Sequence, residues 1–240
     1  MGYPERIIPD ETSAGIIALH LKRYAFALPW CEGREVLDVA CGVGYGTAVL
    51  AKAAARVVGG DIDEASISYA RERYGGTNVE FAVLDVAALP FEDASFDAVC
   101  SFETIEHLHK PEALVDEASR VLRPTGAFLV STPRAERTTH APDNPFHCLE
   151  YAREDFERVL GTRFESVDLY GERRPQTRLH RALQRLDVFG LRRRSALVRR
   201  ASMLTGTPAT EHLTLNDVVI SREGVDGAPV LYAVCTRPRR

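Results

Sequence analysis

The feature of this sequence that most restricts its fold is a glycine-rich turn that follows a short apolar segment. Residues 35–40 read EVLDVA, a run expected to form a buried strand, and the next six residues are CGVGYG. Glycine tolerates the backbone conformations of a tight turn and lets a ligand approach the main chain. The alanine-rich residues 46–56 are predicted to continue as a helix, whose first N–H groups would face an anionic group bound at the turn.

Strand-like and helix-like segments alternate through the first two thirds of the chain. Asp63 is the predicted N-cap of one helix, and Pro111 stands in the first turn of another. Repeated β-α-β units require right-handed crossovers, so they predict a doubly wound, mostly parallel sheet of the α/β class. The predicted elements after the first unit are strands at 56–61, 79–85, 96–101 and 127–132 and helices at 64–74 and 111–122.

The last third of the chain has a different character. Segments 164–170 and 230–236 are predicted strands that close the sheet, which makes seven strands in all. Residues 173–200 hold ten arginines against one acid, Asp187, and are predicted to belong to a helical insertion between these two strands. The expected organisation is a single domain, 1–240, made of an N-terminal helical cap (1–32), a cofactor-binding core (33–171), a basic helical lid (172–227) and a closing strand (228–240).

Composition excludes several classes of protein. Apolar residues make up 45% and charged residues 27% of the chain, which excludes a disordered or fibrous protein. The net charge of −4 gives no overall attraction to nucleic acid. No apolar run approaches the roughly 20 residues of a membrane helix, and the first residues do not resemble a signal peptide. The five cysteines are widely spaced without a C-x-x-C pair. We therefore expect a cytoplasmic, reducing location.

Carboxylates follow the next two predicted strands. Asp61 ends the second strand, nineteen residues after Gly42, and Asp85 ends the third. Ligands bind at the carboxyl ends of strands in doubly wound sheets, where Asp61 could accept hydrogen bonds from two ribose hydroxyls and Asp85 from an adenine amino group. The G-x-G-x-G spacing lacks the last glycine of a dinucleotide fingerprint, where Thr47 stands, and this disfavours an NAD-dependent oxidoreductase.

With these residues in view, the sequence resembles the class I S-adenosylmethionine-dependent methyltransferases over residues 33–171. The segments that carry the resemblance are 36–46 (VLDVACGVGYG), 60–63 (GDID), 89–91 (LPF), 95–97 (SFD) and 122–126 (LRPTG, with Thr125 in place of the usual glycine). The resemblance implies a Rossmann-like methyltransferase fold and S-adenosylmethionine as cofactor. It implies that Asp61 binds the ribose, Asp85 and Val86 the adenine, and that Asp38 orders the loop at the methionine moiety. The implied cofactor-binding residues are Asp38, Gly42, Gly44, Gly46, Asp61, Ile62, Asp85 and Val86.

A second polar group follows the fourth predicted strand. Glu103, Glu106 and His107 stand at positions i, i+3 and i+4, which share one face of a helical turn. His147 follows the fifth predicted strand, 127–132, on a loop that starts near the same edge of the sheet. The predicted metal ligands are Glu103, Glu106, His107 and His147. The carboxylates favour Mg²⁺ or Mn²⁺, and the imidazoles leave Zn²⁺, Co²⁺ or Fe²⁺ open. His107 and His147 are also the predicted catalytic residues, with His147 as general base if it is not a ligand.

The E-x-x-E-H pattern resembles two metal-dependent subgroups, the small-RNA 2′-O-methyltransferases and the catechol O-methyltransferases of the ubiquinone pathway. Segments 144–151 and 20–26 are similar to bacterial methyltransferases of glycan and polysaccharide assembly clusters. These resemblances imply an S-adenosylmethionine-dependent O-methyltransferase that acts on a hydroxyl of a sugar or other vicinal-diol small molecule, assisted by a divalent metal.

Several alternatives stay open. The arginines of 173–200 could bind a phosphorylated or lipid-linked saccharide, RNA or an anionic membrane surface, or they could be a solvated face of the lid. RNA 2′-O-methylation and non-catalytic binding of S-adenosylmethionine are the competing functions, and a homodimer is compatible with the sequence. His20 and Tyr24 could line the entry of the cofactor, but an amphipathic packing helix explains them equally well and is the preferred interpretation. The histidines without a partner pattern are expected at the surface, namely His109, His140, His180 and His212.

Overall fold

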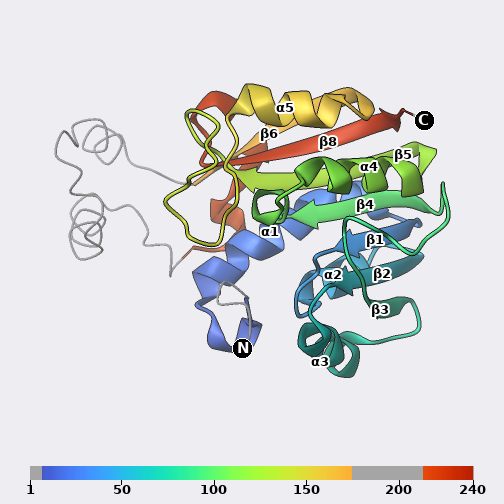
Figure 1. Ribbon diagram of the computed structural model, residues 1–240. Helices are drawn as coiled ribbons and strands as arrows, with labels where there is room; N and C mark the ends of the chain where they lie inside the picture. Colours follow the sequence, from blue (N-terminus) through green and yellow to red (C-terminus); the bar gives the residue numbers. More distant parts are fainter. Residues whose placement is uncertain (1–6, 175–212, 240) are drawn as a thin grey trace.

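The structure of this protein is a computed structural model that describes residues 7–174 and 213–239. Its sheet has the strand order β3-β2-β1-β4-β5-β8-β6-β7, with helices on both faces (Figure 1). The strands are β1 (Glu35–Val39), β2 (Arg56–Asp61), β3 (Val79–Val83), β4 (Phe96–Phe102), β5 (Leu122–Pro133), β6 (Phe164–Arg173), β7 (Val219–Ser221) and β8 (Val230–Pro238). The helices are α1 (Ala14–Cys31), α2 (Tyr45–Leu50), α3 (Glu64–Tyr74), α4 (Pro111–Val121) and α5 (Arg153–Gly161), with short 3-10 helices η1 (Pro9–Glu11), η2 (Ile105–His107), η5 (Leu215–Asp217) and η6 (Val225–Gly227).

The predicted α/β class and mostly parallel sheet are confirmed. Strands β1 to β5 pair in parallel, and β8 lies antiparallel between β5 and β6. Val39 of β1 pairs with Gly60 of β2, and Asp38 pairs with Cys100 of β4. This register ends three neighbouring strands at one edge of the sheet, so the residues that follow them are brought together.

The predicted number of seven strands is wrong, because the sheet has an eighth strand, β7, at its edge. β7 pairs with Gly171–Arg173 of β6, which continues three residues beyond the predicted end. Three residues are too few to show an alternating pattern in a sequence. β7 also lies within 172–227, which the sequence predicts to be a helical insertion throughout, so the prediction is wrong for Val219–Ser221. Residues 175–212 of that predicted insertion lie outside the described residues.

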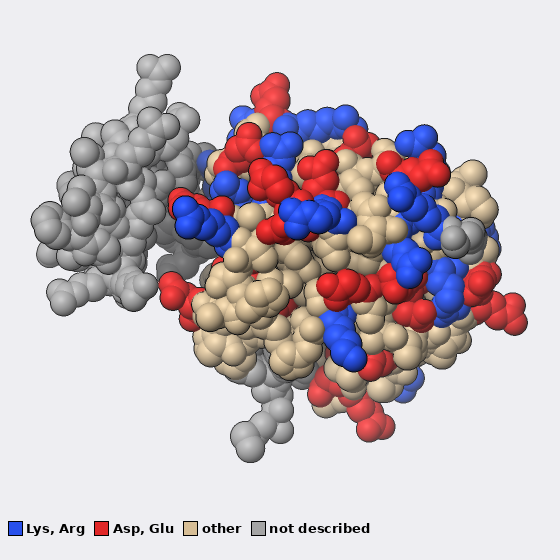
Figure 2. Space-filling model, turned by 45° about the horizontal axis from the view of Figure 1, so that its top comes forward, with Lys and Arg blue, Asp and Glu red and all other residues tan. Residues whose placement is uncertain are grey.

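Charged side chains of both signs are interspersed over the upper and right-hand parts of the face that Figure 2 presents, and uncharged residues gather at its lower left. Ion pairs on the described surface include Arg163 with Asp116 and Arg153 with Asp226. This arrangement gives the described part of that face no extended field of one sign. The predicted contacts of the arginine-rich segment with phosphate, RNA or lipid stay predictions, because most of that segment lies outside the described residues.

Within the described ranges, no helix has both the length and the apolarity that a membrane crossing requires.

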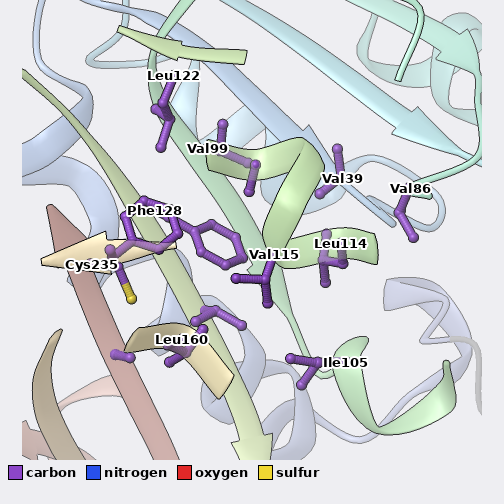
Figure 3. Packing of buried hydrophobic residues seen from close by; sticks show 14 of the residues in the cluster. Val39, Val86, Val99, Ile105, Leu114, Val115, Leu122, Phe128, Leu160 and Cys235 are labelled. Carbon is purple, nitrogen blue, oxygen red and sulfur yellow. The ribbon is translucent and has the colours of Figure 1, made fainter. Parts of the chain in front are cut away.

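Alternation along the strands divides the core between the two faces of the sheet. Val99 of β4 points into the cluster that α4 and α5 cover, whereas Ala98 and Cys100 belong to the cluster under α1 and α2. Figure 3 shows the first of these clusters, to which β5 contributes Phe128, α4 contributes Val115 and α5 contributes Leu160. Buried strands with two covered faces explain why the apolar runs of this sequence are continuous.

Helix α1 packs against the first turn of α2, where the glycine-rich segment 41–46 ends. The ring of Tyr24 lies over Gly46, where a Cβ atom would come within 1.8 Å of the ring. Tyr24 also contacts Phe102 edge-to-face, at 5.2 Å between ring centroids. Gly46 therefore serves close packing in this structure, and its predicted contact with cofactor stays a prediction.

Asp38 joins β1 to the first turn of α2 through a buried hydrogen bond. Thr47 Oγ1 donates to Asp38 Oδ2 at 2.7 Å. Burial raises the pKa of Asp38 to about 7, with Asp61 raising it further and the Thr47 hydroxyl opposing the shift. Asp38 is thus a buried acid that fixes the helix behind the turn, in agreement with the ordering role that the resemblance implies.

The Gly46→Ala substitution is expected to lower the free energy of unfolding by about 1–3 kcal/mol, because the added methyl overlaps the Tyr24 ring. Urea unfolding without cofactor measures this. Gly227→Ala is the control, since a Cβ there meets nothing within 4 Å. In a Tyr24→Ala background the further cost of Gly46→Ala should vanish. An equal cost in both backgrounds would show that the ring is not the cause.

Asp38→Asn is expected to make stability less dependent on pH. Asp38 ionises near 3.8 in the unfolded chain and near 7 in the fold, so the native state binds the extra proton between these values and loses stability as pH rises through this window. Asparagine keeps an acceptor for Thr47 but has no proton to lose. The stability of the variant relative to the parent should therefore rise by about 2–3 kcal/mol from pH 5 to pH 8. A pH-independent difference in urea unfolding would contradict the raised pKa.

Candidate functional site

One cavity of about 760 Å³ lies over the carboxyl ends of β1, β2 and β4. It brings together the residues that the sequence predicts at separate strand ends. The predicted residues that line it are Gly42, Asp61, Ile62, Asp85, Val86, Glu103, Glu106, His107 and His147. Asp38, Gly44 and Gly46 do not line it. Gly44 and Gly46 pack against Phe81 and Tyr24, and Asp38 accepts the hydrogen bond from Thr47. Two groups of residues, predicted for cofactor and acceptor, therefore share one space.

The glycine turn is held in place by Asp61. The Gly42 N–H donates to Asp61 Oδ2 at 2.8 Å, and the Asp63 N–H donates to Asp61 Oδ1 at 2.9 Å. Gly42 and Gly44 have positive φ angles of 56° and 83°, which glycine adopts without strain. Each carboxylate oxygen can accept more than one hydrogen bond, so Asp61 can hold the turn and still bind ribose hydroxyls.

Glu106 is a buried carboxyl group at the far end of the cavity. Thr132 Oγ1 donates to Glu106 Oε2 at 3.2 Å, and Oε1 has no hydrogen-bond partner among the described residues. Burial, reinforced by Glu103, raises the pKa of Glu106 well above its ordinary value. The N–H groups of Cys148 and Leu149 donate to the Glu106 carbonyl, which ties the loop of His147 to η2.

Two histidines meet beside Glu106. His107 Nδ1 lies 2.9 Å from the Phe146 carbonyl, which can only accept, so Nδ1 carries the proton and the lone pair of the neutral ring is on Nε2. His147 Nδ1 lies 2.8 Å from Glu150 Oε1, and the Asn144 amide donates to His147 Nε2 at 2.9 Å. The two rings are 4.9 Å apart between centroids.

Glu150 was not identified from the sequence as a functional residue. It stands three residues after His147 on a loop rather than on a helix, so periodicity gave no signal. The pair forms a carboxylate–imidazole dyad, in which Glu150 fixes the tautomer and leaves Nε2 as the basic atom.

The structure corrects the prediction that Glu103 shares a face with Glu106 and His107. Residues 103–107 do not form one α-helical turn, because η2 begins at Ile105 and Glu103 has a left-handed backbone with φ 53°. The Glu103 carboxylate accepts a hydrogen bond from Ser131 Oγ at 2.8 Å and pairs with Arg23 at 3.1 Å. Among the described residues, the group whose ligand atoms lie within 4.8 Å of one another is Glu106, His107 and His147, without Glu103.

Helix α1 supplies three cavity residues, of which His20 and Tyr24 have packing as their preferred interpretation in the sequence and Arg23 has no predicted role. His20, Arg23 and Tyr24 all line the cavity. His20 Nδ1 accepts from the Tyr45 hydroxyl at 3.0 Å and from Arg23 at 3.2 Å. Burial and the neighbouring Arg23 lower the pKa of His20 to about 3, so this imidazole is neutral. The signal in the sequence was a pair of charged residues, Lys22 and Arg23, inside a mostly apolar helical segment.

The histidines expected at the surface fall into two groups. His109 and His140 are exposed, and His109 Nε2 lies 3.9 Å from the sulfur of Cys148. His180 and His212 lie outside the described residues.

Comparison with known proteins agrees with the fold and with the glycine turn. A family model described as "Methyltransferase domain" matches residues 37–130. A Mycolicibacterium smegmatis protein named "Probable S-adenosylmethionine-dependent methyltransferase" is 43% identical over 147 residues, which are 59% of this chain and 56% of that protein. A fatty-acid O-methyltransferase from the same organism is 34% identical over 137 residues, 54% of this chain and 50% of that protein. The chain thus spans about half the length of these relatives.

Solved structures share the fold at low sequence identity. The crystal structure of the (4+2)-cyclase SpnF aligns with a TM-score of 0.60 and 18% identity, over 96% of this chain and 86% of that one. A likeness at this identity shows the fold and leaves the reaction open. Residues 37–130 of this chain thus match the methyltransferase domain family, the relatives at 34–43% identity are named as methyltransferases, and the sheet has the Rossmann-like methyltransferase fold.

Proposed function

We propose that this protein is an S-adenosylmethionine-dependent O-methyltransferase whose acceptor is a hydroxyl of a sugar or another neutral diol. One observation carries the proposal: a single cavity joins the glycine turn, Asp61 and Asp85 to the His147–Glu150 dyad. A methyl donor at the first end and an acceptor at the second end would share the same space, as in-line transfer requires.

The cofactor end has the charges that a sulfonium ion needs. Among the described residues, three acidic side chains line the cavity at the ends of β2 and β3, and they are Asp61, Asp63 and Asp85. A carboxylate-rich wall favours a cation over a neutral ligand. The hydrogen bond from the turn to Asp61 also fixes the carboxylate where a ribose would lie beside Gly42.

The acceptor end has a base suited to a hydroxyl. The sulfonium methyl is already reactive, so the protein must align the nucleophile and remove its proton. With Nδ1–H held by Glu150, His147 presents Nε2 as proton acceptor, in a position that the Asn144 amide now occupies. An acceptor hydroxyl that replaced this amide would donate its proton to Nε2, and the Glu150 carboxylate would stabilise the resulting imidazolium.

The same charges argue against a carboxylate acceptor such as a fatty acid. Arg23 is the one arginine or lysine among the described residues that line the cavity, and Glu103 already pairs with it at 3.1 Å. The described lining therefore has no second cation for a carboxylate acceptor, whereas a neutral hydroxyl needs none. The fatty-acid O-methyltransferase among the relatives therefore supports methylation of oxygen but not the same acceptor.

A divalent metal also fits three of the four predicted ligands. Glu106, His107 and His147 converge, and the buried Glu106 Oε1 lacks a partner among the described residues, so a cation there would satisfy it. When bound, such an ion would lower the pKa of an acceptor hydroxyl. With Glu103 turned away, one carboxylate and two imidazoles favour Mn²⁺, Fe²⁺, Co²⁺ or Zn²⁺ over Mg²⁺. As a ligand, His147 would not act as base, so the two roles exclude each other.

RNA methylation receives no support from the described residues. The arginines that motivated it are mainly in 175–212, outside the part of the chain that the structure describes. Non-catalytic binding of S-adenosylmethionine is separated from the proposal by experiment: calorimetric binding of the cofactor without methyl transfer to any acceptor would favour it.

The His147→Ala variant is expected to lower kcat for methylation of a saccharide acceptor by at least about 10²-fold, because the hydroxyl loses its base. The Kd for S-adenosylmethionine should not change. Glu150→Gln should lower kcat less, since an imidazole remains. Labelled S-adenosylmethionine with a panel of neutral saccharides, fatty acids and small RNAs measures transfer, and calorimetry measures binding. His140→Ala is the matched control, an exposed histidine away from the cavity. Full activity of His147→Ala would remove this residue from the mechanism.

Removal of divalent metal separates the two roles of His147. If Glu106, His107 and His147 hold an ion, a chelator should abolish transfer, and Mn²⁺ or Zn²⁺ should restore it. Glu106→Gln should then weaken calorimetric metal binding at least about tenfold. Undiminished transfer after chelation would leave His147 as a base without a metal.

A further inference from the structure

Arg23 is a buried cation at the wall of the cavity. The residue is 5% exposed, its Nη2 lies 3.1 Å from Glu103 Oε2, and its Nη1 lies 3.2 Å from His20 Nδ1. Its Nε is buried without a hydrogen-bond partner among the described residues. A guanidinium has five N–H donors in a fixed plane, so Arg23 can take another acceptor without releasing Glu103.

Hydrogen bonds with Ser131 fix both the backbone and the carboxylate of Glu103 beside this cation. The Glu103 backbone is left-handed, with φ 53°, a strained conformation for a non-glycine residue. Ser131 Oγ donates to its carboxylate, and the Glu103 N–H donates to the Ser131 carbonyl at 3.2 Å. The result is an ion pair of the Glu103 carboxylate and the Arg23 guanidinium, fixed at the cavity wall.

The pair lies beside the glycine turn. Asp38 of β1 pairs with Cys100 of β4, so the residues after β1 and those after β4 come level at the same edge of the sheet. Arg23 reaches this point from α1, whose next residue, Tyr24, packs on Gly46 of the turn. Under the proposed function, this is where the amino-acid end of the cofactor would lie.

Arg23 is the one arginine or lysine among the described residues that line the cavity. The amino-acid end of S-adenosylmethionine carries a carboxylate, which the acids of the lining would repel, and an ammonium group, which they would attract. We propose that Arg23 and Glu103 form a receptor for this zwitterion, in which the Arg23 guanidinium binds the α-carboxylate and the Glu103 carboxylate binds the α-ammonium. Glu103 is therefore a cofactor-binding residue and not a metal ligand. This inference rests on the proposed function and adds two binding residues to it.

The test uses the full-length protein and three thioethers, whose sulfur atom is uncharged, so that sulfonium charge does not contribute. They are S-adenosylhomocysteine, its decarboxylated form and 5′-methylthioadenosine, which lacks the whole amino-acid end. Calorimetry with the parent protein should give about tenfold or more tighter binding of S-adenosylhomocysteine than of the decarboxylated form. Arg23→Met should remove most of this difference and leave methylthioadenosine binding within about twofold. Arg23→Lys, which keeps the charge but not the planar fork, should fall between.

Glu103→Gln should weaken the decarboxylated thioether, which keeps the ammonium, and leave methylthioadenosine unchanged. Lys22→Met is the matched control, because it removes a positive charge from α1 at a residue that does not line the cavity. Equal weakening of all three thioethers by Arg23→Met, or no weakening, would overturn the inference. A parent protein that binds S-adenosylhomocysteine no better than its decarboxylated form would overturn the inference and leave the proposed function intact. A parent protein that binds none of these nucleosides and no S-adenosylmethionine would overturn both.

Discussion

The parallel pairing of β1 with β2 and with β4 is the constraint on which the candidate site depends. Because Val39 pairs with Gly60 and Asp38 with Cys100, the chain must leave these three strands at one edge. A slip of one residue would move every buried side chain of β1 to the opposite face of the sheet, so packing on both faces fixes the register. The distances from the glycine turn to Asp61 and to the Arg23–Glu103 pair are consequences of that register.

Much of this arrangement could be predicted from local sequence. The bounds of β2 and α3 agree with the prediction, because Asp61 and Asp63 mark the end of an apolar strand and the cap of a helix, and Ser66 N–H does donate to Asp63. Residues at strand ends were found because fold class alone places them at the binding edge. β7 was not predicted because a strand of three residues is too short to show an alternation of apolar and polar side chains.

The arrangement of the acceptor end could not be predicted in the same way. Spacing assumes a regular backbone, and Glu103 departs from it through a left-handed conformation that a glutamate rarely adopts. Its partner, Arg23, is eighty residues away in the sequence, and a single sequence contains no signal for such a pair. The partner of His147 is near in sequence but on a loop, where no periodicity says which side chains face each other.

Several groups at this site reduce stability rather than add to it. Burial raises the pKa of both Asp38 and Glu106, so ionisation of either group opposes folding near neutral pH, and Ala40 and Glu103 adopt positive φ angles. Under the proposed function, other acids at the strand ends, Asp61, Asp63 and Asp85, favour the cationic methyl donor over the neutral thioether that remains after transfer. Loss of the positive charge at sulfur removes an attraction to these side chains while the zwitterionic end is unchanged, so the product binds less tightly than the donor. The acidic lining would thereby help the site to release its product.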